Sequence, residues 1–481
     1  MAYISTNPAT GEVAATFAEH TPAELEERLG RAAAAFASWR DRPFAERARR
    51  LTEAAGLFEA ESPQIASLLT AEMGKTLAAA RAEVAKCALA MRWFAQHAEL
   101  LLAPEPVAGA AGESRVVYEP LGAVLAVMPW NFPLWQVVRF AAPALMAGNV
   151  CLVKHASNVP RAALALEDLF RRAGFPDGVY TNLLLSAGGV ATVVADPRVA
   201  AVTLTGSEAA GRAIAAAAGA ALKKSVLELG GSDPFLVLDS ADLGRAVPAA
   251  VAARVQNNGQ SCIAAKRFVV VASRHDEFLQ RFVAGMAALR VGDPCDASTD
   301  VGPLVSAAQR DEVAGQVEDA RDKGAAVHCG GIVPAGPGFF YPPTVLTGVT
   351  AGMRVAREEV FGPVAVVHRV AGFEEALRVA NGTPWGLGAS VWADDPGEQQ
   401  AAVARLEAGM VFVNAVVAST PELPFGGTKR SGYGRELAAA GIREFCNLKS
   451  VFVACGVTAG RTAAGPAPLP AFPSGTAGAP R

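Results

Sequence analysis

Short apolar strands alternate with helical segments from about residue 115 to residue 229. Apolar runs rich in β-branched residues occur at 124–127, 149–153 and 199–204, with helical segments between them. A strand that is apolar along its whole length is typical of a parallel sheet that is covered by helices on both faces. The alternation therefore predicts an α/β fold with a doubly wound parallel sheet, whose ligands bind at the carboxyl ends of the strands.

A second alternating series begins near residue 230. It runs from 235–238 through 268–271 to 411–413 and predicts a second α/β domain. A chain of 481 residues is long enough for two such domains.

The two ends of the chain differ from this pattern. Charges at helical spacing in Ala-rich sequence predict helices over 25–39, 45–62 and 64–102. From residue 456 onward the chain is mostly Gly, Ala, Pro, Ser and Thr, which predicts disorder for 457–481.

Composition excludes several functional classes. Lys and Arg number 43 against 46 Asp and Glu, which gives a net charge of -3. A chain with this balance has no positive electrostatic field that would attract nucleic acid or an anionic membrane. We find no apolar run of 18 residues, and residues 1–11 lack the pattern of a signal peptide. The seven cysteines are scattered without CxxC pairs or zinc-like spacing, so we expect no metal and a reducing, cytoplasmic setting.

Five short motifs carry the chemical information. They are Pro129-Trp130-Asn131-Phe132-Pro133, Leu204-Thr205-Gly206-Ser207, Leu227-Glu228-Leu229-Gly230-Gly231, Gln256-Asn257-Asn258-Gly259-Gln260-Ser261-Cys262 and Glu358-Glu359-Val360-Phe361-Gly362-Pro363. In this order and spacing the chain resembles the aldehyde dehydrogenase superfamily, over roughly residues 5 to 455.

The resemblance implies a division of the chain into parts. An NAD(P)-binding domain would span 1–113 and 124–229, and a catalytic domain would span 230–424. A small β arm formed by 114–123 and 445–456 would join subunits into a homodimer or homotetramer.

Three residues are the candidate catalytic groups. Cys262 is the predicted nucleophile, because a thiolate that attacks an aldehyde gives a thiohemiacetal from which hydride can leave. The polar turn before it is expected to lead into a helix-like stretch whose amides favour thiolate. Asn131 matches the family's oxyanion donor, although an ordinary helix N-cap is the alternative. Glu228, in an apolar stretch, is the predicted general base with a raised pKa, against the alternative of a structural ion pair.

The expected cofactor is NADP or NAD. Gly206, Ser207, Glu208 and Gly211 follow a strand and open a helix, whose first amides can face a diphosphate. The resemblance adds further cofactor contacts at Trp130, Leu229, Glu359 and Phe361.

Lys154 and Ser157 bear on the choice between the two cofactors. They match the segment that holds the adenosine ribose, where many NAD-using members carry Glu in place of Ser157. Because Ser157 does not repel a 2′-phosphate and Lys154 adds positive charge, NADP is favoured, with dual use expected.

The substrate is expected to be a semialdehyde. Within the superfamily the chain looks most like bacterial succinate-semialdehyde dehydrogenases. A substrate carboxylate needs a cation or good donors, and Arg139 is the predicted anchor, with a helix-edge surface position as the alternative. Ser419 matches a hydroxyl that helps to hold the same carboxylate. Gln256 stands where some members carry a second arginine, so the site for the substrate carboxylate has less positive charge.

Two other functions remain open from the sequence. One is a broader aliphatic or ω-carboxy aldehyde dehydrogenase, acting for example on glutarate semialdehyde. The other is an inactive member of the fold with a structural or binding role, which the intact Cys262, Glu228 and Asn131 disfavour.

Overall fold

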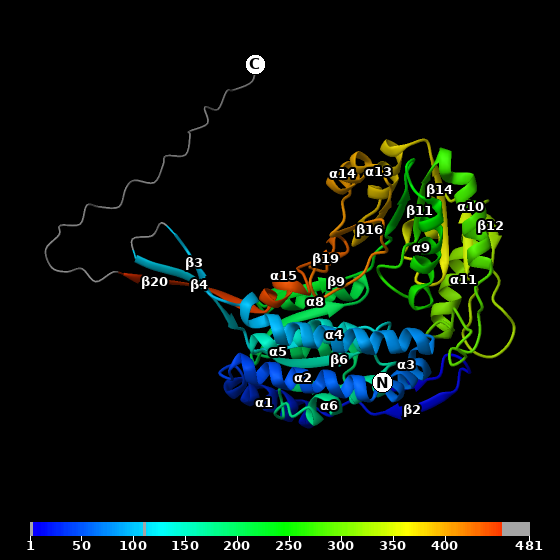
Figure 1. The fold of residues 1–481 in the computed structure, drawn as a ribbon. Helices are drawn as coiled ribbons and strands as arrows, with labels where there is room; N and C mark the ends of the chain where they lie inside the picture. The colour runs from blue at the N-terminus through cyan, green and yellow to red at the C-terminus, as the bar shows by residue number, and fades with distance from the viewer. Residues whose placement is uncertain (1–2, 109–111, 455–481) are drawn as a thin grey trace, which may run out of the picture.

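The protein consists of two α/β lobes and a long β arm that projects from one of them (Figure 1). The structure is a computed structural model and describes residues 3–108 and 112–454. The predicted disordered segment 457–481 lies outside the described residues. No helix in the described ranges is long and apolar enough to cross a membrane.

The first lobe contains a six-stranded sheet in the order β19-β9-β8-β5-β6-β7. All neighbours pair in parallel except β19, which pairs antiparallel with β9. This confirms the predicted doubly wound parallel sheet. The strands are β5 (Ala123–Met128), β6 (Val150–His155), β7 (Tyr180–Asn182), β8 (Val199–Thr205), β9 (Lys224–Glu228) and β19 (Gly432–Tyr433).

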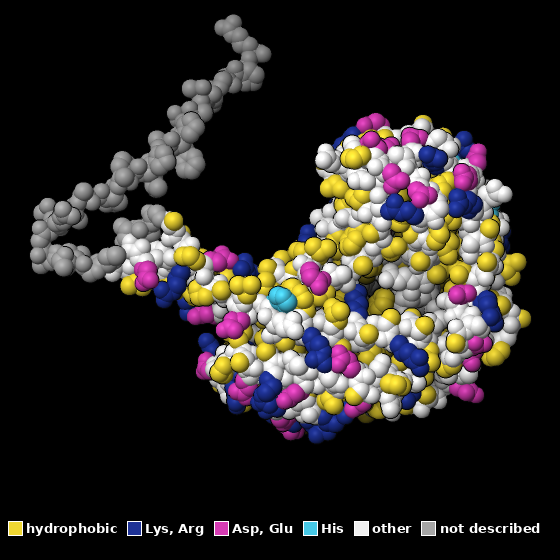
Figure 2. All heavy atoms as spheres, viewed as in Figure 1, with side chains coloured by type: hydrophobic (Ala, Val, Ile, Leu, Met, Phe, Trp, Pro, Cys, Tyr) yellow, Lys and Arg dark blue, Asp and Glu magenta, His cyan; other side chains and the backbone are white. Residues whose placement is uncertain are grey.

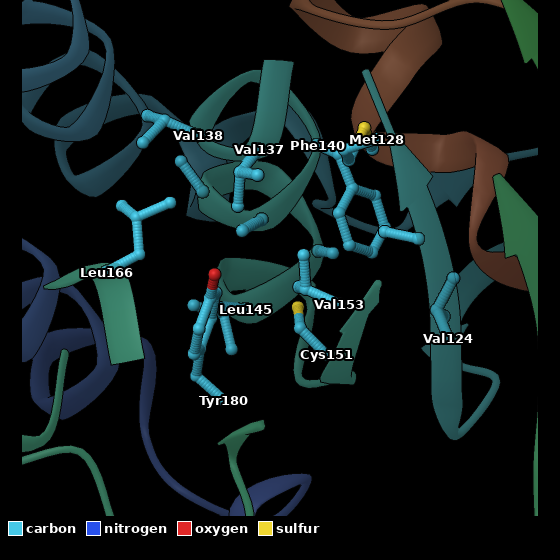
Figure 3. Packing of buried hydrophobic residues seen from close by; sticks show 14 of the residues in the cluster. Val124, Met128, Val137, Val138, Phe140, Leu145, Cys151, Val153, Leu166 and Tyr180 are labelled. Atoms are coloured by element: carbon cyan, nitrogen blue, oxygen red, sulfur yellow. The ribbon is translucent and has the colours of Figure 1, made fainter. Parts of the chain in front are cut away.

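Helix α5 (Trp135–Ala147) lies against this sheet and is buried on every side. Its sequence is apolar around the whole helix, which is typical of a helix that crosses a protein core. Figure 3 shows Val137 and Phe140 of α5 near Val153 of β6 and Val124 of β5. The other helices of this sheet are α6 (Pro160–Arg172), α7 (Ala187–Ala195), α8 (Glu208–Ala220) and α15 (Ala438–Glu444).

Four N-terminal helices cover the same lobe. They are α1 (Pro22–Trp39), α2 (Phe44–Ala60), α3 (Ser62–Met73) and α4 (Leu77–Leu101), and a hairpin of β1 (Tyr3–Thr6) and β2 (Val13–Phe17) precedes them. The single helix predicted over 64–102 is therefore wrong. Gly74 takes a left-handed φ of 86° that ends α3, and the Thr76 side chain caps α4 by accepting from the Ala79 N–H at 3.3 Å.

The second lobe holds a seven-stranded sheet in the order β12-β13-β14-β11-β10-β16-β17. Only β12 pairs antiparallel within it. The strands are β10 (Pro234–Val237), β11 (Arg267–Val271), β12 (Ala326–Cys329), β13 (Thr344–Thr347), β14 (Val364–Val370), β16 (Gly388–Trp392) and β17 (Met410–Val413). The helices are α9 (Leu243–Val255), α10 (Ala272–Ala287), α11 (Ala307–Asp322), α12 (Arg354–Arg357), α13 (Phe373–Asn381) and α14 (Pro396–Arg405).

The arm is a three-stranded antiparallel sheet. It comprises β3 (Glu105–Pro106), β4 (Gly112–Pro120) and β20 (Cys446–Ala454), and Tyr118 faces Leu448 in its register. Hydrophobic side chains gather along this arm (Figure 2), where Leu448 and Phe452 are each 59% exposed. A role of the arm in joining subunits stays a prediction.

Two strands of the first sheet deliver motif residues to one edge. β5 ends immediately before Pro129-Trp130-Asn131, and its neighbour β8 ends immediately before Gly206. Since the carboxyl ends of parallel strands share one edge of the sheet, the two motifs meet there. The next strand, β9, ends at Glu228 itself.

Candidate active site

One cavity brings together residues from all five motifs. Its volume is about 260 Å³. Cys262, Glu228 and Asn131 line it together with residues predicted to bind the cofactor, namely Trp130, Gly206, Ser207, Leu229, Glu359 and Phe361. The folded chain thus gathers the predicted nucleophile, base and oxyanion donor around one space.

Cys262 lies in a turn and is half-buried. The helix-like stretch expected after it is absent, because residues 262–266 form turns and irregular backbone before β11 begins at Arg267. That expectation was wrong, so no helix start favours the thiolate. Burial raises the pKa of the Cys262 thiol to about 12, while the positive charges of Arg139 and Lys266 oppose this rise.

The loop before Cys262 has an unusual backbone. Asn257 and Asn258 have left-handed φ angles of 55° and 58°, and Gly259 follows with a φ of 77°. A side chain at Gly259 would collide with the backbone of Gly362, so glycine is required there. Buried asparagine hydrogen bonds stabilise this conformation, since Asn258 Nδ2 donates to the carbonyl oxygens of Gly74 at 2.9 Å and Pro303 at 3.0 Å.

Asn131 is buried beside this loop. Its Nδ2 donates to the Gln260 carbonyl at 3.1 Å, which leaves one amide N–H without an acceptor. Among the described residues, the backbone N–H of Cys262 also donates no hydrogen bond. Two N–H donors beside the nucleophile are what an oxyanion requires. The structure does not use Asn131 as the cap of α5, whose N-cap is Leu134.

A buried ion pair fixes the position of Asn131. Lys75 is fully buried, pairs with Glu83 and donates to the Asn131 carbonyl at 3.0 Å. Glu83 in turn accepts from the backbone N–H groups of Leu134 and Trp135, each at 2.9 Å, and so caps α5. The sequence analysis missed both residues, since Lys75 lies in the break of the helix predicted over 64–102.

Glu228 is buried at the end of β9, with 2% of its surface exposed. Neither carboxylate oxygen has a hydrogen-bond partner among the described residues. Desolvation raises the pKa of Glu228 well above its usual value, and the nearby Glu436 raises it further, while Arg139 acts in the opposite direction. A carboxyl group in this state has the properties of a general base or acid.

Arg139 lies in the core and forms an ion pair with Glu436. Its Nη2 donates to Thr205 Oγ1 at 3.3 Å, and its guanidinium lies 4.2 Å from the centre of the Phe425 ring. It does not line the cavity around Cys262. The role of Arg139 as the carboxylate anchor stays a prediction, and its partner in this structure is Glu436. The alternative of a helix-edge surface position does not apply, since only 1% of Arg139 is exposed.

The start of α8 forms the wall of the cavity next to β8. Ser207 is the N-cap and accepts from the Ala210 N–H at 3.3 Å. Gly211 lets α8 approach β9 closely, because a side chain there would lie 2.6 Å from Leu229. The Glu208 carboxylate contacts Arg212 of the same helix at 2.5 Å. The part of Glu208 that is available to a diphosphate is therefore its backbone N–H.

Glu359 and Phe361 form another part of the cavity wall. Glu359 contacts the Lys266 ammonium at 3.2 Å and accepts from the Gly231 N–H at 3.2 Å. The Phe361 ring stands edge-on to Trp130, with 5.6 Å between the ring centres.

Lys154 and Ser157 lie at the same edge of the sheet, at the carboxyl end of β6. Lys154 is half-buried near the end of β6, and Ser157 is exposed just beyond it. The Ser157 carbonyl accepts from the Ile4 N–H at 3.0 Å, which ties this segment to β1. Burial lowers the pKa of Lys154, and the negative charge of Glu19 acts in the opposite direction.

Ser419 is buried next to α5. Its Oγ accepts from Trp135 Nε1 at 3.0 Å and from the Lys86 ammonium at 2.7 Å. The sequence analysis did not find Lys86 or Glu436. Their positions within a helical run and a loop gave no local indication, because their contacts are with residues far along the chain.

Comparison with known proteins agrees with this geometry. The sequence model described as the aldehyde dehydrogenase family matches residues 2–451. The chain belongs to the aldehyde dehydrogenase family. The family resemblance inferred from the motifs is thereby confirmed.

Individual relatives cover almost the whole chain. A succinate-semialdehyde dehydrogenase [NADP(+)] 1 of Mycobacterium tuberculosis (strain ATCC 25618 / H37Rv) is 58% identical over 451 residues, which are 93% of this chain and 99% of the relative. The solved structure of Gox0499 has a TM-score of 0.93 and 44% identity, and covers 94% of this chain and 100% of its own. The succinic semialdehyde dehydrogenase of Streptococcus pyogenes in complex with NADP+ has a TM-score of 0.92 and 38% identity, over 94% of this chain and 99% of its own. These structures confirm the predicted aldehyde dehydrogenase-like α/β fold.

Proposed function

We propose that this member of the aldehyde dehydrogenase family oxidises succinate semialdehyde to succinate with NADP as the preferred cofactor. The observation that carries the proposal is the single cavity in which Cys262, Asn131 and the unpartnered Glu228 meet. The 58% identity to a relative named for this substrate and cofactor supports it.

The residues present fit the cofactor. The open N-terminus of α8 at Ser207 offers backbone N–H groups to a diphosphate. The half-buried Lys154 and the exposed Ser157 would hold the ribose end without repelling a 2′-phosphate. When bound, the nicotinamide ring supplies the hydride acceptor.

The first half of the reaction belongs to Cys262 and Asn131. The Cys262 thiol loses its proton, and the thiolate sulfur forms a bond to the aldehyde carbon while the C=O π bond opens, so that the carbonyl oxygen becomes an oxyanion. The free N–H of Asn131 and the backbone N–H of Cys262 donate to that oxygen. Loss of hydride from the thiohemiacetal leaves a thioester on Cys262.

The second half belongs to Glu228. As a carboxylate it removes a proton from water, which attacks the thioester and releases the acid and the thiol. Because its pKa is raised, Glu228 is a stronger base than an ordinary carboxylate and is suited to accept this proton.

Two variants and a panel of aldehydes test this proposal. Cys262→Ala should abolish formation of NADPH while NADP+ binding persists, and Glu228→Ala should give one burst of NADPH and then stall at the thioester. The panel is succinate semialdehyde, glutarate semialdehyde and butanal, with absorbance at 340 nm as the readout. Steady turnover in Cys262→Ala would exclude the covalent mechanism. A kcat/KM that is higher for butanal than for succinate semialdehyde would exclude succinate semialdehyde as the preferred substrate.

We propose in addition that the arm joins subunits into a homo-oligomer. Leu448 and Phe452 on β20 are exposed and apolar, which supports an interface with a second copy of this chain. Phe452→Asp should lower the molecular mass measured by analytical ultracentrifugation, and an unchanged mass would argue against the arm as the interface.

A further inference from the structure

Lys266 is a buried cation that contacts the backbone of the nucleophile. Only 2% of the residue is exposed, and it lies four positions after Cys262 in the chain. Its ammonium donates to the backbone carbonyls of Cys262 at 2.8 Å, Ser261 at 3.2 Å and Ala264 at 3.3 Å. The Glu359 carboxylate lies 3.2 Å away. The shortest of these four contacts is therefore with the carbonyl of the nucleophile itself.

The backbone of Lys266 is fixed by the central strands of the second sheet. Its N–H donates to the Asp233 carbonyl at 3.0 Å, and its carbonyl accepts from the Val366 N–H at 3.0 Å. These bonds extend the pairing of β11 with β10 and β14 back to Lys266. The lysine side chain thus starts from a rigid part of the fold, and its ammonium is a fixed point for the loop that it binds.

The three carbonyls belong to one tight turn. The Ala264 N–H donates to the Ser261 carbonyl at 3.2 Å, which closes a β-turn over residues 261–264 with Cys262 in its second position. That single hydrogen bond is the turn's own closure. The Lys266 ammonium adds three more bonds and holds the carbonyls of the turn toward the sheet.

The position of the Ser261 carbonyl decides where the Cys262 N–H points. The two groups belong to the same planar peptide, and in a trans peptide the C=O and the N–H point in opposite directions. Since Lys266 binds the carbonyl side, the N–H is directed to the opposite side of the turn. Among the described residues this N–H has no acceptor, and Cys262 lines the cavity. The N–H is therefore available to an oxyanion.

We propose that Lys266 is a positioning residue that keeps the Cys262 N–H directed at the aldehyde oxygen by binding the carbonyls on the other side of the turn. This inference rests on the covalent role of Cys262 in the proposed function. Lys266 does not line the cavity, so it acts through the turn and not on the aldehyde. A lysine that served only as the counter-ion of Glu359 would not need three backbone carbonyls.

The role has two kinetic consequences. An oxyanion forms on every aldehyde, so the effect of Lys266 should be the same for substrates with and without a carboxylate. The donor acts most strongly in the transition state, so its misplacement should slow the chemical step even at saturating aldehyde.

The Glu228→Ala background isolates formation of the thioester. One NADPH forms there for each active site, and stopped-flow absorbance at 340 nm gives both a rate constant and an amplitude. The amplitude counts folded sites, whereas the rate constant reports the chemical step. Adding Lys266→Met, which removes the N–H donors from a side chain of similar length, should lower the rate constant by roughly 10- to 100-fold. The loss should be equal for succinate semialdehyde and butanal, and the amplitude should stay near one NADPH per site.

Two further variants in the same background separate positioning from folding. Lys266→Gln keeps two N–H donors without the charge on a shorter side chain, so its rate constant should lie between those of Lys266→Met and the parent. Lys223→Met is the matched control, because Lys223 also donates to backbone carbonyls, those of Val194 and Asp196. Lys223 lies at the amino end of β9, the opposite edge of the sheet from the site, so this variant should keep the parent rate constant.

The outcomes separate this inference from the proposed function. A rate constant in Lys266→Met within about threefold of the parent, a loss for only one aldehyde, or a Lys266→Gln variant no faster than Lys266→Met would overturn the role of Lys266. If Lys266→Met does not fold and gives no burst, a lowered rate constant in Lys266→Gln supports the role and an unchanged one overturns it. Absence of a burst in Glu228→Ala itself would instead overturn the proposed function, before any change at Lys266.

Discussion

The Asn257 side chain donates to the backbone carbonyl of Asn131 over 2.8 Å. This hydrogen bond joins the loop that carries the nucleophile to the loop that carries the oxyanion donor. The same Nδ2 donates to the Gln260 carbonyl at 3.1 Å, which is also the acceptor for Asn131 Nδ2. Asn257 thus fixes the relative position of Cys262 and Asn131 together with the direct hydrogen bond from Asn131 to Gln260.

Asn257→Ala should lower both stability and turnover. The variant loses two hydrogen bonds and places alanine at a φ of 55°, so we expect a free energy of unfolding about 2–3 kcal/mol lower. The kcat should fall by about tenfold or more for every aldehyde, because the oxyanion donor moves. Urea denaturation and steady-state kinetics measure the two effects. Asn257→Gly keeps the left-handed backbone accessible and should recover part of the stability but not the kcat.

Glu228→Gln should make stability less dependent on pH. The folded protein holds the Glu228 proton to higher pH than the unfolded chain does, because the pKa of Glu228 is raised by burial. In the window between the two pKa values the native state binds more protons, so wild-type stability falls as pH rises, by about 1.4 kcal/mol for each pH unit. Glutamine does not ionise, so the variant does not lose stability in this way as the pH rises. The Tm of the variant should therefore exceed that of the wild type at pH 8 and equal it at pH 4, and a Tm difference that is constant with pH would contradict a raised pKa.

Ser157→Glu should change the cofactor preference. A carboxylate at this exposed position would repel a 2′-phosphate and accept from a 2′-hydroxyl, so the KM for NADP+ should rise by about tenfold or more while that for NAD+ stays level or falls. Initial rates with each cofactor measure the ratio. Ser157→Gln has nearly the same size without the charge and serves as the control. Parallel changes in both KM values would mean that Ser157 does not face the ribose.

Arg139→Leu should impair the oxidation of both succinate semialdehyde and butanal. The change leaves Glu436 unpaired in the core near Glu228, which we expect to cost about 3–5 kcal/mol of stability and to raise the pKa of Glu228 further. The double variant Arg139→Leu with Glu436→Leu removes the unpaired charge and should regain most of the Tm. A loss confined to succinate semialdehyde would instead support the sequence-based role of Arg139 as the carboxylate anchor.

The sequence by itself determined the fold class and the catalytic candidates. Strand composition is a local property, so the apolar runs at 124–127 and 199–204 predicted the parallel sheet in which β5 and β8 now lie side by side. The motif around Cys262 likewise pointed to the chemistry, because the chemical types of Cys262, Glu228 and Asn131 are fixed by the chain alone. The break at Gly74 was missed, since a helical pattern continues on both sides of it.

Only the tertiary structure decided which charges remain free. Lys75, Lys86 and Arg139 are three cations in helical or turn sequence, and nothing local distinguishes them. Folding pairs Lys75 with Glu83 and Arg139 with Glu436, while it leaves Lys86 beside a hydroxyl and an indole ring. Glu436 lies 297 residues after Arg139 in the chain, and Ser419 lies 333 residues after Lys86. The electrostatics of the site depend on such long-range neighbours, and no sequence pattern encodes them.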